Sequence, residues 1–340
     1  MKNGILAICI MSLLSLQTKA QDSPTVNVDL SGRASYINDR IGSEVQHANS
    51  GMKGDYLDLS VYGDIGKGFS YAWRQMLNRK IENNNFFDAT AWVYITYKPT
   101  EHWSIEGGKQ VLLIGGFEYD RTPMDIYTAS EYWYNIGCYQ FGASTAYHSR
   151  NDKLTLQFSE SPFRQPDRHD MYAYNLYWTG NHGFWKTLYS LNMMEYAPDK
   201  YISYIALGNH FDIGRFALEL DYMNRAASHQ TYFFKDCSVM AELKYRPVSK
   251  LSLYGKVTYD VNHAGTDADK CVMDGTELTT VAGGLEFWPI KGKEDVRLNL
   301  GVAHTTGKNG NPNGRMVDDK LTVQVGVSAK LNLFRYSKNR

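Results

Sequence analysis

The sequence predicts an all-β protein, a transmembrane antiparallel β-barrel of about 16 strands. Three observations support this fold class. Apolar residues recur at every second position along many short segments, which is typical of strands with one apolar face. The connections alternate between short turns and longer polar loops, as they do in barrels that cross a membrane. The chain also holds 25 Tyr and 7 Trp, many at strand ends, where such rings collect at membrane interfaces.

Residues 1–20 have the pattern of a secretory signal peptide. Lys2 lies in a short basic region, an apolar stretch follows it, and Ala20 is a small residue before the expected cut. Cleavage removes two lysines and no acid, so 36 − 2 = 34 basic residues stand against 36 acidic ones. A charge this close to zero indicates neither nucleic acid nor another strongly charged partner. We expect residues 21–340 to form one barrel domain.

The clearest strand is expected over residues 321–333, where Leu and Val alternate with small and polar residues. Segments with this period recur, each about ten residues long, which is the length that a tilted strand needs to cross a bilayer. The mean hydropathy of −0.43 fits this fold, because only alternate side chains would face lipid. The closing strand lacks a clear terminal aromatic residue, since Phe334 is out of phase with Leu331 and Leu333. The expected strand starts lie near residues 26, 56, 69, 89, 103, 137, 153, 171, 184, 201, 215, 237, 251, 277, 296 and 321.

The alternative to a barrel is a soluble β protein rich in aromatic residues. Such a protein would not need strands of regular length, nor loops that are short at one end and long at the other. An even number of strands places both termini on the periplasmic side, where the turns are short. The sequence therefore predicts a protein of a Gram-negative type outer membrane, in contact with membrane lipids.

The third long loop is expected between residues 114 and 136, and the stretch around it carries a recognisable motif. It contains Gly108-Lys109-Gln110, then Gly115-Gly116-Phe117-Glu118-Tyr119-Asp120, Pro123 and Ser130-Glu131. This combination resembles the segment that marks the phosphate-selective porin O and P family. The resemblance implies a porin of 16 strands, a homotrimer, whose third loop folds into the lumen and narrows the pore. It also implies passive diffusion of small hydrophilic or anionic solutes, with phosphate as one candidate.

The loop residues are compatible with an inward fold on physical grounds. Gly115 and Gly116 allow a sharp turn off the strand end, and Pro123 keeps the segment from adding to the sheet. Irregular backbone at membrane depth is tolerated where it lines a water-filled cavity. The alternative is an ordinary loop exposed at the surface.

Eight charged residues are predicted to line the pore or its constriction. The loop supplies acids and one base, and three strands supply bases at mid-height, while other strands add charges of both signs. Lys109 would face the lumen only if Gly107 and Gly108 form a bulge, since it otherwise faces lipid. Acids on the loop opposite bases on the wall would create a transverse field that favours small polar solutes, whereas so few bases on the loop argue against phosphate specificity. The eight are Arg33, Arg74, Lys109, Glu118, Asp120, Arg121, Asp125 and Glu131.

Other functions have less support. The sequence has no G-x-S-x-G or H-E-x-x-H motif and no Cys/His set with metal spacing, so we expect neither enzyme activity nor a cofactor. A hydrolase would need Ser130 or Ser144 beside His148. Two alternatives stay open: a channel for a particular oligosaccharide, with aromatic side chains as a stacking track, and a structural or adhesive barrel with a closed lumen.

Three cysteines follow the signal peptide, at positions 138, 237 and 271. They are too few for a disulfide framework. Cys237 and Cys271 both fall at the exterior end of the predicted barrel, so a disulfide between them is expected if their Cα atoms lie within about 7 Å.

Overall fold

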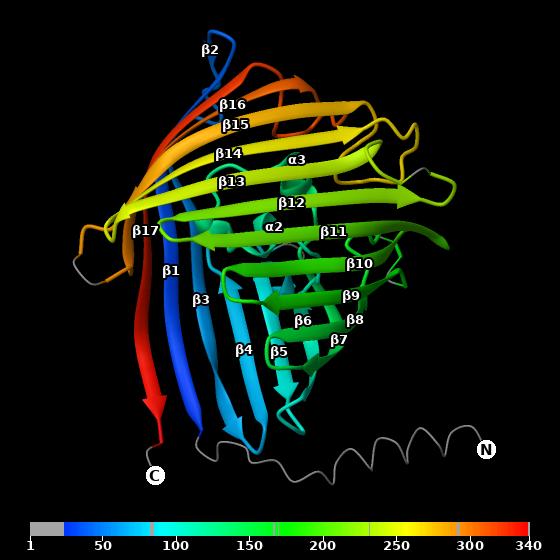
Figure 1. The fold of residues 1–340 in the computed structure, drawn as a ribbon, viewed down its shortest axis with the longest axis vertical. Helices are drawn as coiled ribbons and strands as arrows, with labels where there is room; N and C mark the ends of the chain where they lie inside the picture. The colour runs from blue at the N-terminus through cyan, green and yellow to red at the C-terminus, as the bar shows by residue number, and fades with distance from the viewer. Residues whose placement is uncertain are drawn as a thin grey trace.

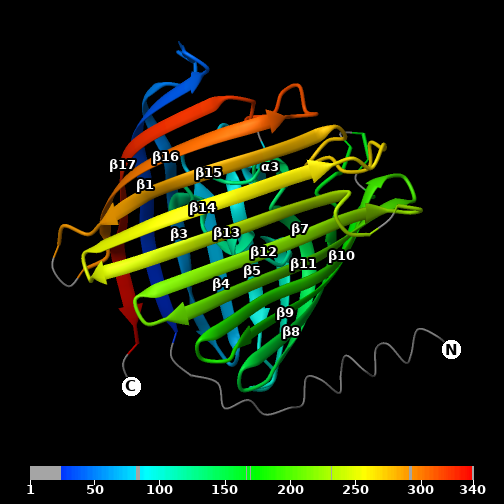
Figure 2. The ribbon, with the colours of Figure 1, turned by 45° about the horizontal axis from the view of Figure 1, so that its top comes forward.

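A single closed sheet forms the protein. The computed structural model describes residues 24–81, 85–165, 167–168, 170–230, 232–290 and 293–338. The sheet closes because β1 (Thr25–Ile41) pairs antiparallel with both β3 (Gly51–Gly66) and β17 (Lys320–Ser337). Figures 1 and 2 show the strands following one another around this barrel. The predicted signal peptide lies outside the described residues.

The wall of the barrel contains 16 long antiparallel strands in the described part of the chain, which confirms the predicted fold class. A further strand, β2 (Glu44–Val45), pairs with the end of β1 in the first long loop. Each wall strand begins within two residues of its expected start, except β3, which begins five residues earlier. The remaining strands are β4 (Phe69–Met76), β5 (Thr90–Tyr97), β6 (Trp103–Val111), β7 (Tyr139–His148), β8 (Asp152–Glu160), β9 (Tyr172–Asn181), β10 (Trp185–Ala197), β11 (Lys200–Ile213), β12 (Phe216–Ala227), β13 (Asp236–Val248), β14 (Leu251–Asn262), β15 (Thr276–Phe287) and β16 (Val296–Lys308).

The strands present an apolar face outward and a polar face inward. On β16, Leu298, Leu300 and Val302 are exposed, whereas Asn299 between them is buried. The same alternation on neighbouring strands produces an apolar outer belt, which is the surface that meets lipid in a barrel of this kind. No helix in the described ranges is long and apolar enough to span a membrane.

The helical turns are short and lie between strands. The turn η1 (Phe86–Ala89) precedes β5, and three others fall within residues 112–138, which we call the β6–β7 segment. They are α2 (Phe117–Asp120), η2 (Pro123–Asp125) and α3 (Glu131–Asn135). This segment is the third long loop that the sequence predicts.

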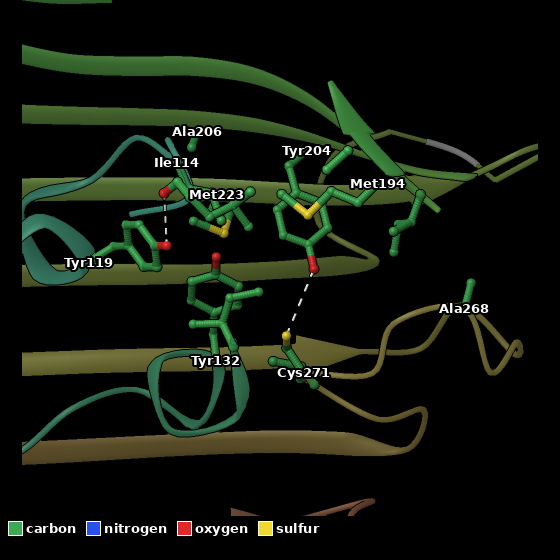
Figure 3. Packing of buried hydrophobic residues seen from close by; sticks show 14 of the residues in the cluster. Ile114, Tyr119, Tyr132, Met194, Tyr204, Ala206, Met223, Ala268 and Cys271 are labelled. Atoms are coloured by element: carbon green, nitrogen blue, oxygen red, sulfur yellow. Dashed lines mark hydrogen bonds between the residues drawn. The ribbon is translucent and has the colours of Figure 1, made fainter. Parts of the chain in front are cut away.

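A buried apolar cluster joins the β6–β7 segment to the wall (Figure 3). Tyr119 and Tyr132 come from the segment, and Tyr204 comes from β11. The Tyr119 hydroxyl donates to the carbonyl oxygen of Leu112 at 2.8 Å. The Tyr204 hydroxyl lies 3.9 Å from Sγ of Cys271, in the loop between β14 and β15. Residues from three distant parts of the chain therefore form one core.

The expected disulfide between Cys237 and Cys271 is wrong, because Cys138, Cys237 and Cys271 are all free. Cys271 packs in the cluster inside the barrel. Cys237 lies on β13 in the same alternating phase as Val239, which is exposed on the outer face. The two thiols therefore lie on opposite faces of the sheet.

Thiol counting tests this arrangement. After unfolding without a reductant, the chain that lacks residues 1–20 should take up three maleimide groups, as measured by intact mass. Uptake of a single group would show that two of the cysteines form a disulfide.

The alternation of turns and loops predicts which end of the barrel faces outward. A peptide tag inserted after Asp267, whose side chain is 92% exposed, should be reached by an antibody on intact cells. A tag after Ser249, in the short turn between β13 and β14, should be reached only after the outer membrane is opened. The reverse result would show that the barrel has the opposite orientation in the membrane.

Candidate functional site

Gly115 and Gly116 lie directly against the wall at the start of the β6–β7 segment. A Cβ atom on Gly115 would lie 2.6 Å from the carbonyl oxygen of Leu188 and 2.9 Å from that of Ala206. The wall residue opposite Gly116 is also a glycine, Gly208. A Cβ atom on Gly208 would lie 2.7 Å from Cα of Gly116. These glycines are therefore required by close approach of two backbones, in addition to the turn expected from sequence.

Hydrogen bonds from β10 and β12 hold the backbone that follows. The Ser190 hydroxyl accepts from the Gly115 amide at 2.8 Å. The carboxylate of Asp221 accepts from the amide of Phe117 at 2.9 Å and from that of Glu118 at 2.8 Å. Asp221 thus accepts from the backbone N–H groups at the start of α2. Without it, a capping residue within the segment would have to bond them.

Arg121 lies between two carboxylates of the wall. Its Nη1 donates to Glu242 Oε2 at 2.8 Å, and its Nη2 bonds Glu219. Burial alone would lower the pKa of Arg121, but the two carboxylates outweigh burial and raise it. A base on the segment therefore faces acids on β12 and β13, the reverse of the predicted arrangement.

Two acids of the segment face bases, as the sequence suggested, but in direct ion pairs. Glu118 lies 2.6 Å from Nζ of Lys256 on β14, and Asp125 pairs with Arg297 on β16. Burial would raise the pKa of Asp125, but the charge of Arg297 and the hydrogen bonds from Thr122 and Arg297 together outweigh burial and lower the pKa. Close pairing reduces the long-range field that was expected, because the opposite charges cancel at a distance.

Arg33 of β1 contacts the middle of the segment from the other side of the barrel. Its Nη1 donates to the carbonyl oxygen of Ile126 at 2.6 Å and to that of Met124 at 3.1 Å. Its Nε forms an ion pair with Asp55 of β3 at 3.2 Å. The segment is therefore held by both halves of the wall.

Two cavities lie on either side of this contact. The lower cavity, of about 640 Å³, extends toward the short turns near Asp64, and the upper cavity, of about 680 Å³, extends toward the long loops near Arg315. Thr122, Met124 and Asp125 border the lower cavity, and residues 126–128 border the upper one. The contact at Arg33 thus lies at the boundary between them.

The other predicted residues are placed in different ways. Arg74 lines the lower cavity, where it pairs with Asp58. Asp120 is exposed to a third cavity of about 340 Å³. Glu131 is fully buried, and its carboxylate accepts from the Asn135 side chain at 2.8 Å, so it does not border either main cavity.

Lys109 does not turn inward, because the predicted bulge is wrong. The pairing of β6 with β5 and β7 continues through Gly107 and Gly108 without a register shift. Lys109 therefore shares the outer phase of β6 with Ile105, which is exposed. Its Nζ reaches along the outer surface and donates to the carbonyl oxygen of Phe87 at 2.6 Å.

The serine and histidine pairs considered for a hydrolase are not formed. In the described part of the chain, His148 Nε2 lies 2.8 Å from Oγ of Ser104, and no contact joins it to Ser130 or Ser144. The Ser130 hydroxyl instead bonds Glu118 and caps α3 by accepting from the Trp133 amide.

The barrel resembles solved outer-membrane proteins. OmpT of Vibrio cholerae, which also has a solved trimer form, gives a TM-score of 0.62 at 11% identity, covering 92% of this chain and 99% of that chain. An anion-selective porin from Comamonas acidovorans gives 0.62 at 11% identity, covering 92% and 100%. The outer membrane channel DcaP of Acinetobacter baumannii gives 0.60 at 14% identity, covering 91% and 97%. At these identities the likeness concerns the fold. No curated protein matches the chain.

The family assignment rests on a match along most of the wall. The family model for phosphate-selective porin O and P matches residues 26–265. This range covers more than half of the chain and includes the β6–β7 segment with Gly115 and Gly116. The chain belongs to the phosphate-selective porin O and P family.

Proposed function

We propose that this outer-membrane porin is a passive diffusion channel whose constriction is formed by the β6–β7 segment. The observation that carries the proposal is the pair of cavities that lie on either side of the contact between Arg33 and the carbonyl oxygens of Met124 and Ile126. A solute that crosses the barrel along β1 has to pass between these two spaces. The constriction residues would then be Arg33, Asp125 and their ion-pair partners.

The charges at this level favour small hydrophilic solutes over a dedicated phosphate path. Arg33, Arg74 and Arg297 each have a carboxylate partner, namely Asp55, Asp58 and Asp125. A phosphate-selective path would need bases whose charge is not already neutralised. Anions can still pass, because the pairs leave donor groups on the guanidinium ions.

We also propose that three copies assemble in the membrane. The solved trimer form of V. cholerae OmpT, which has the same fold, supports this assembly. Cross-linking of the protein in isolated outer membranes should give a ladder that ends at three chains. A ladder that stops at one chain would contradict the trimer without affecting the channel.

Conductance measurements test the proposed channel. The chain that lacks the signal peptide, reconstituted in a planar lipid bilayer, should give stepwise ion currents. Absence of any current from folded, inserted protein would contradict a channel and favour a structural barrel with a closed lumen.

A further inference from the structure

The lower cavity has aromatic walls around a small floor. Tyr62 of β3 and Tyr94 of β5 are both paired with Ala72 of β4, the strand between them. Directly paired residues point to the same face of a sheet, and neighbouring strands lie about 4.8 Å apart. The two tyrosines therefore stand on backbones about 10 Å apart, with only the methyl group of Ala72 between them. All three residues line the cavity.

The adjacent row of the sheet adds a third ring and fixed polar groups. Arg74 pairs with both Ser60 and Trp92 across the strands. The guanidinium carbon of Arg74 lies 4.9 Å from the centre of a Trp92 ring. The Tyr62 hydroxyl donates to Asp29 at 3.0 Å. The Trp92 ring, the Tyr62 ring and the polar groups beside them are therefore held in place before any ligand arrives.

The charges of this cavity disfavour an anion. Its lining includes the acids Asp29, Asp64 and Asp125 and the bases Arg74 and Lys330. Lys330 lies 3.7 Å from Asp29, and Arg297 pairs with Asp125. Asp64 is therefore the lining carboxylate that forms no salt bridge within the described residues. Arg74 is also neutralised by Asp58, whose side chain is buried. A ligand that fits has flat apolar faces for the rings and hydroxyl groups at its edge for the carboxylate, amide and hydroxyl groups. A neutral pyranose ring has this chemistry, and a phosphate ion does not.

We propose that the lower cavity is a binding subsite for a neutral sugar, with one ring held over Ala72 between Tyr62, Tyr94 and Trp92. This inference rests on the proposed function as a channel, because it names the class of solute that the channel would carry. The cavity volume of about 640 Å³ lies within the range of small-molecule sites, about 300–1,000 Å³.

Titration with maltotriose and with inorganic phosphate tests the site. Calorimetry on the folded barrel in detergent should show saturable binding of maltotriose. In the bilayer, maltotriose should reduce the ion current at the same concentrations, while phosphate should not compete with it. Trp92→Leu and Tyr94→Leu should each weaken binding at least about tenfold, because each removes one stacking surface. Ala72→Leu should have a similar effect while keeping all three rings, since it fills the floor.

Tyr147→Leu is the matched control, because Tyr147 lies on β7 and is 44% exposed on the outer face. It should leave maltotriose binding unchanged. Ion currents without maltotriose binding would overturn the sugar site and leave the channel intact. Binding that survives Trp92→Leu, Tyr94→Leu and Ala72→Leu would overturn the location of the site. Binding without any ion current would support the site and contradict the channel.

Discussion

Replacing Arg121 with Glu is expected to release the β6–β7 segment from the wall and to raise the single-channel conductance. The change places a third carboxylate beside Glu219 and Glu242, where one guanidinium now bonds both. Removing one partner of a buried ion pair costs about 3–5 kcal/mol of stability. Since 1.4 kcal/mol is a factor of ten, a loss of about 4 kcal/mol shifts the balance between docked and released segment roughly a thousandfold.

Two variants make this result specific. Arg121→Glu combined with Glu219→Arg restores one base between two acids, so it should recover the lower conductance. Arg168→Glu alters an exposed ion pair with Asp170 in a surface loop, so it should leave the conductance unchanged. An unchanged conductance for Arg121→Glu, or an equal rise for Arg168→Glu, would contradict the role of the segment.

Replacing Arg33 and Arg74 together with Gln is expected to make the channel prefer cations. Both arginines border the cavities, and each neutralises an aspartate, Asp55 or Asp58. Their removal leaves Asp55 and Asp58 without a basic partner beside the two cavities, where charges are screened less than at an open surface. The reversal potential in a tenfold salt gradient should move toward the cation limit of about 59 mV.

The opposite change and an outward lysine serve as controls. Asp125→Asn removes the acid that pairs with Arg297, so it should move the reversal potential toward anion preference. Lys109→Gln should have no effect, because Lys109 lies on the outer phase of β6. A shift for Lys109→Gln as large as that for the two arginines would mean that the passage does not follow the two cavities.

The strands could be predicted closely because their signal is local. Alternation along residues 321–333 and its repeats depends only on neighbouring residues, so the 16-strand barrel and every strand start except that of β3 were predicted correctly to within two residues. The β6–β7 segment was also located, because Gly115, Gly116 and Pro123 mark a chain that leaves the sheet. The contacts that these residues make could not be predicted from local sequence patterns.

The incorrect details depend on contacts between distant parts of the chain. Gly108 suggested a bulge, but a Cβ there would lie 2.3 Å from the carbonyl oxygen of Val93, so close packing against β5 explains the glycine. Glu131 was expected at the pore, yet the Met316 amide from the last long loop lies 3.4 Å from its carboxylate. Cys237 and Cys271 lie at the same end of the barrel, but one faces outward and the other inward. Sequence alone did not indicate any of these partners.

The anchors of the β6–β7 segment also constrain the order in which the protein can assemble. The charged partners of Glu118, Arg121 and Asp125 are Lys256, Glu242 and Arg297, which all lie more than 100 positions further along the chain. A chain that has formed only its first six strands therefore carries a charged segment with no partner to neutralise it. The segment can dock only after β12 to β16 are in place, which makes it a late step of folding with high contact order. Truncation of the last strands should consequently leave this segment open to proteases, even where the earlier hairpins have formed.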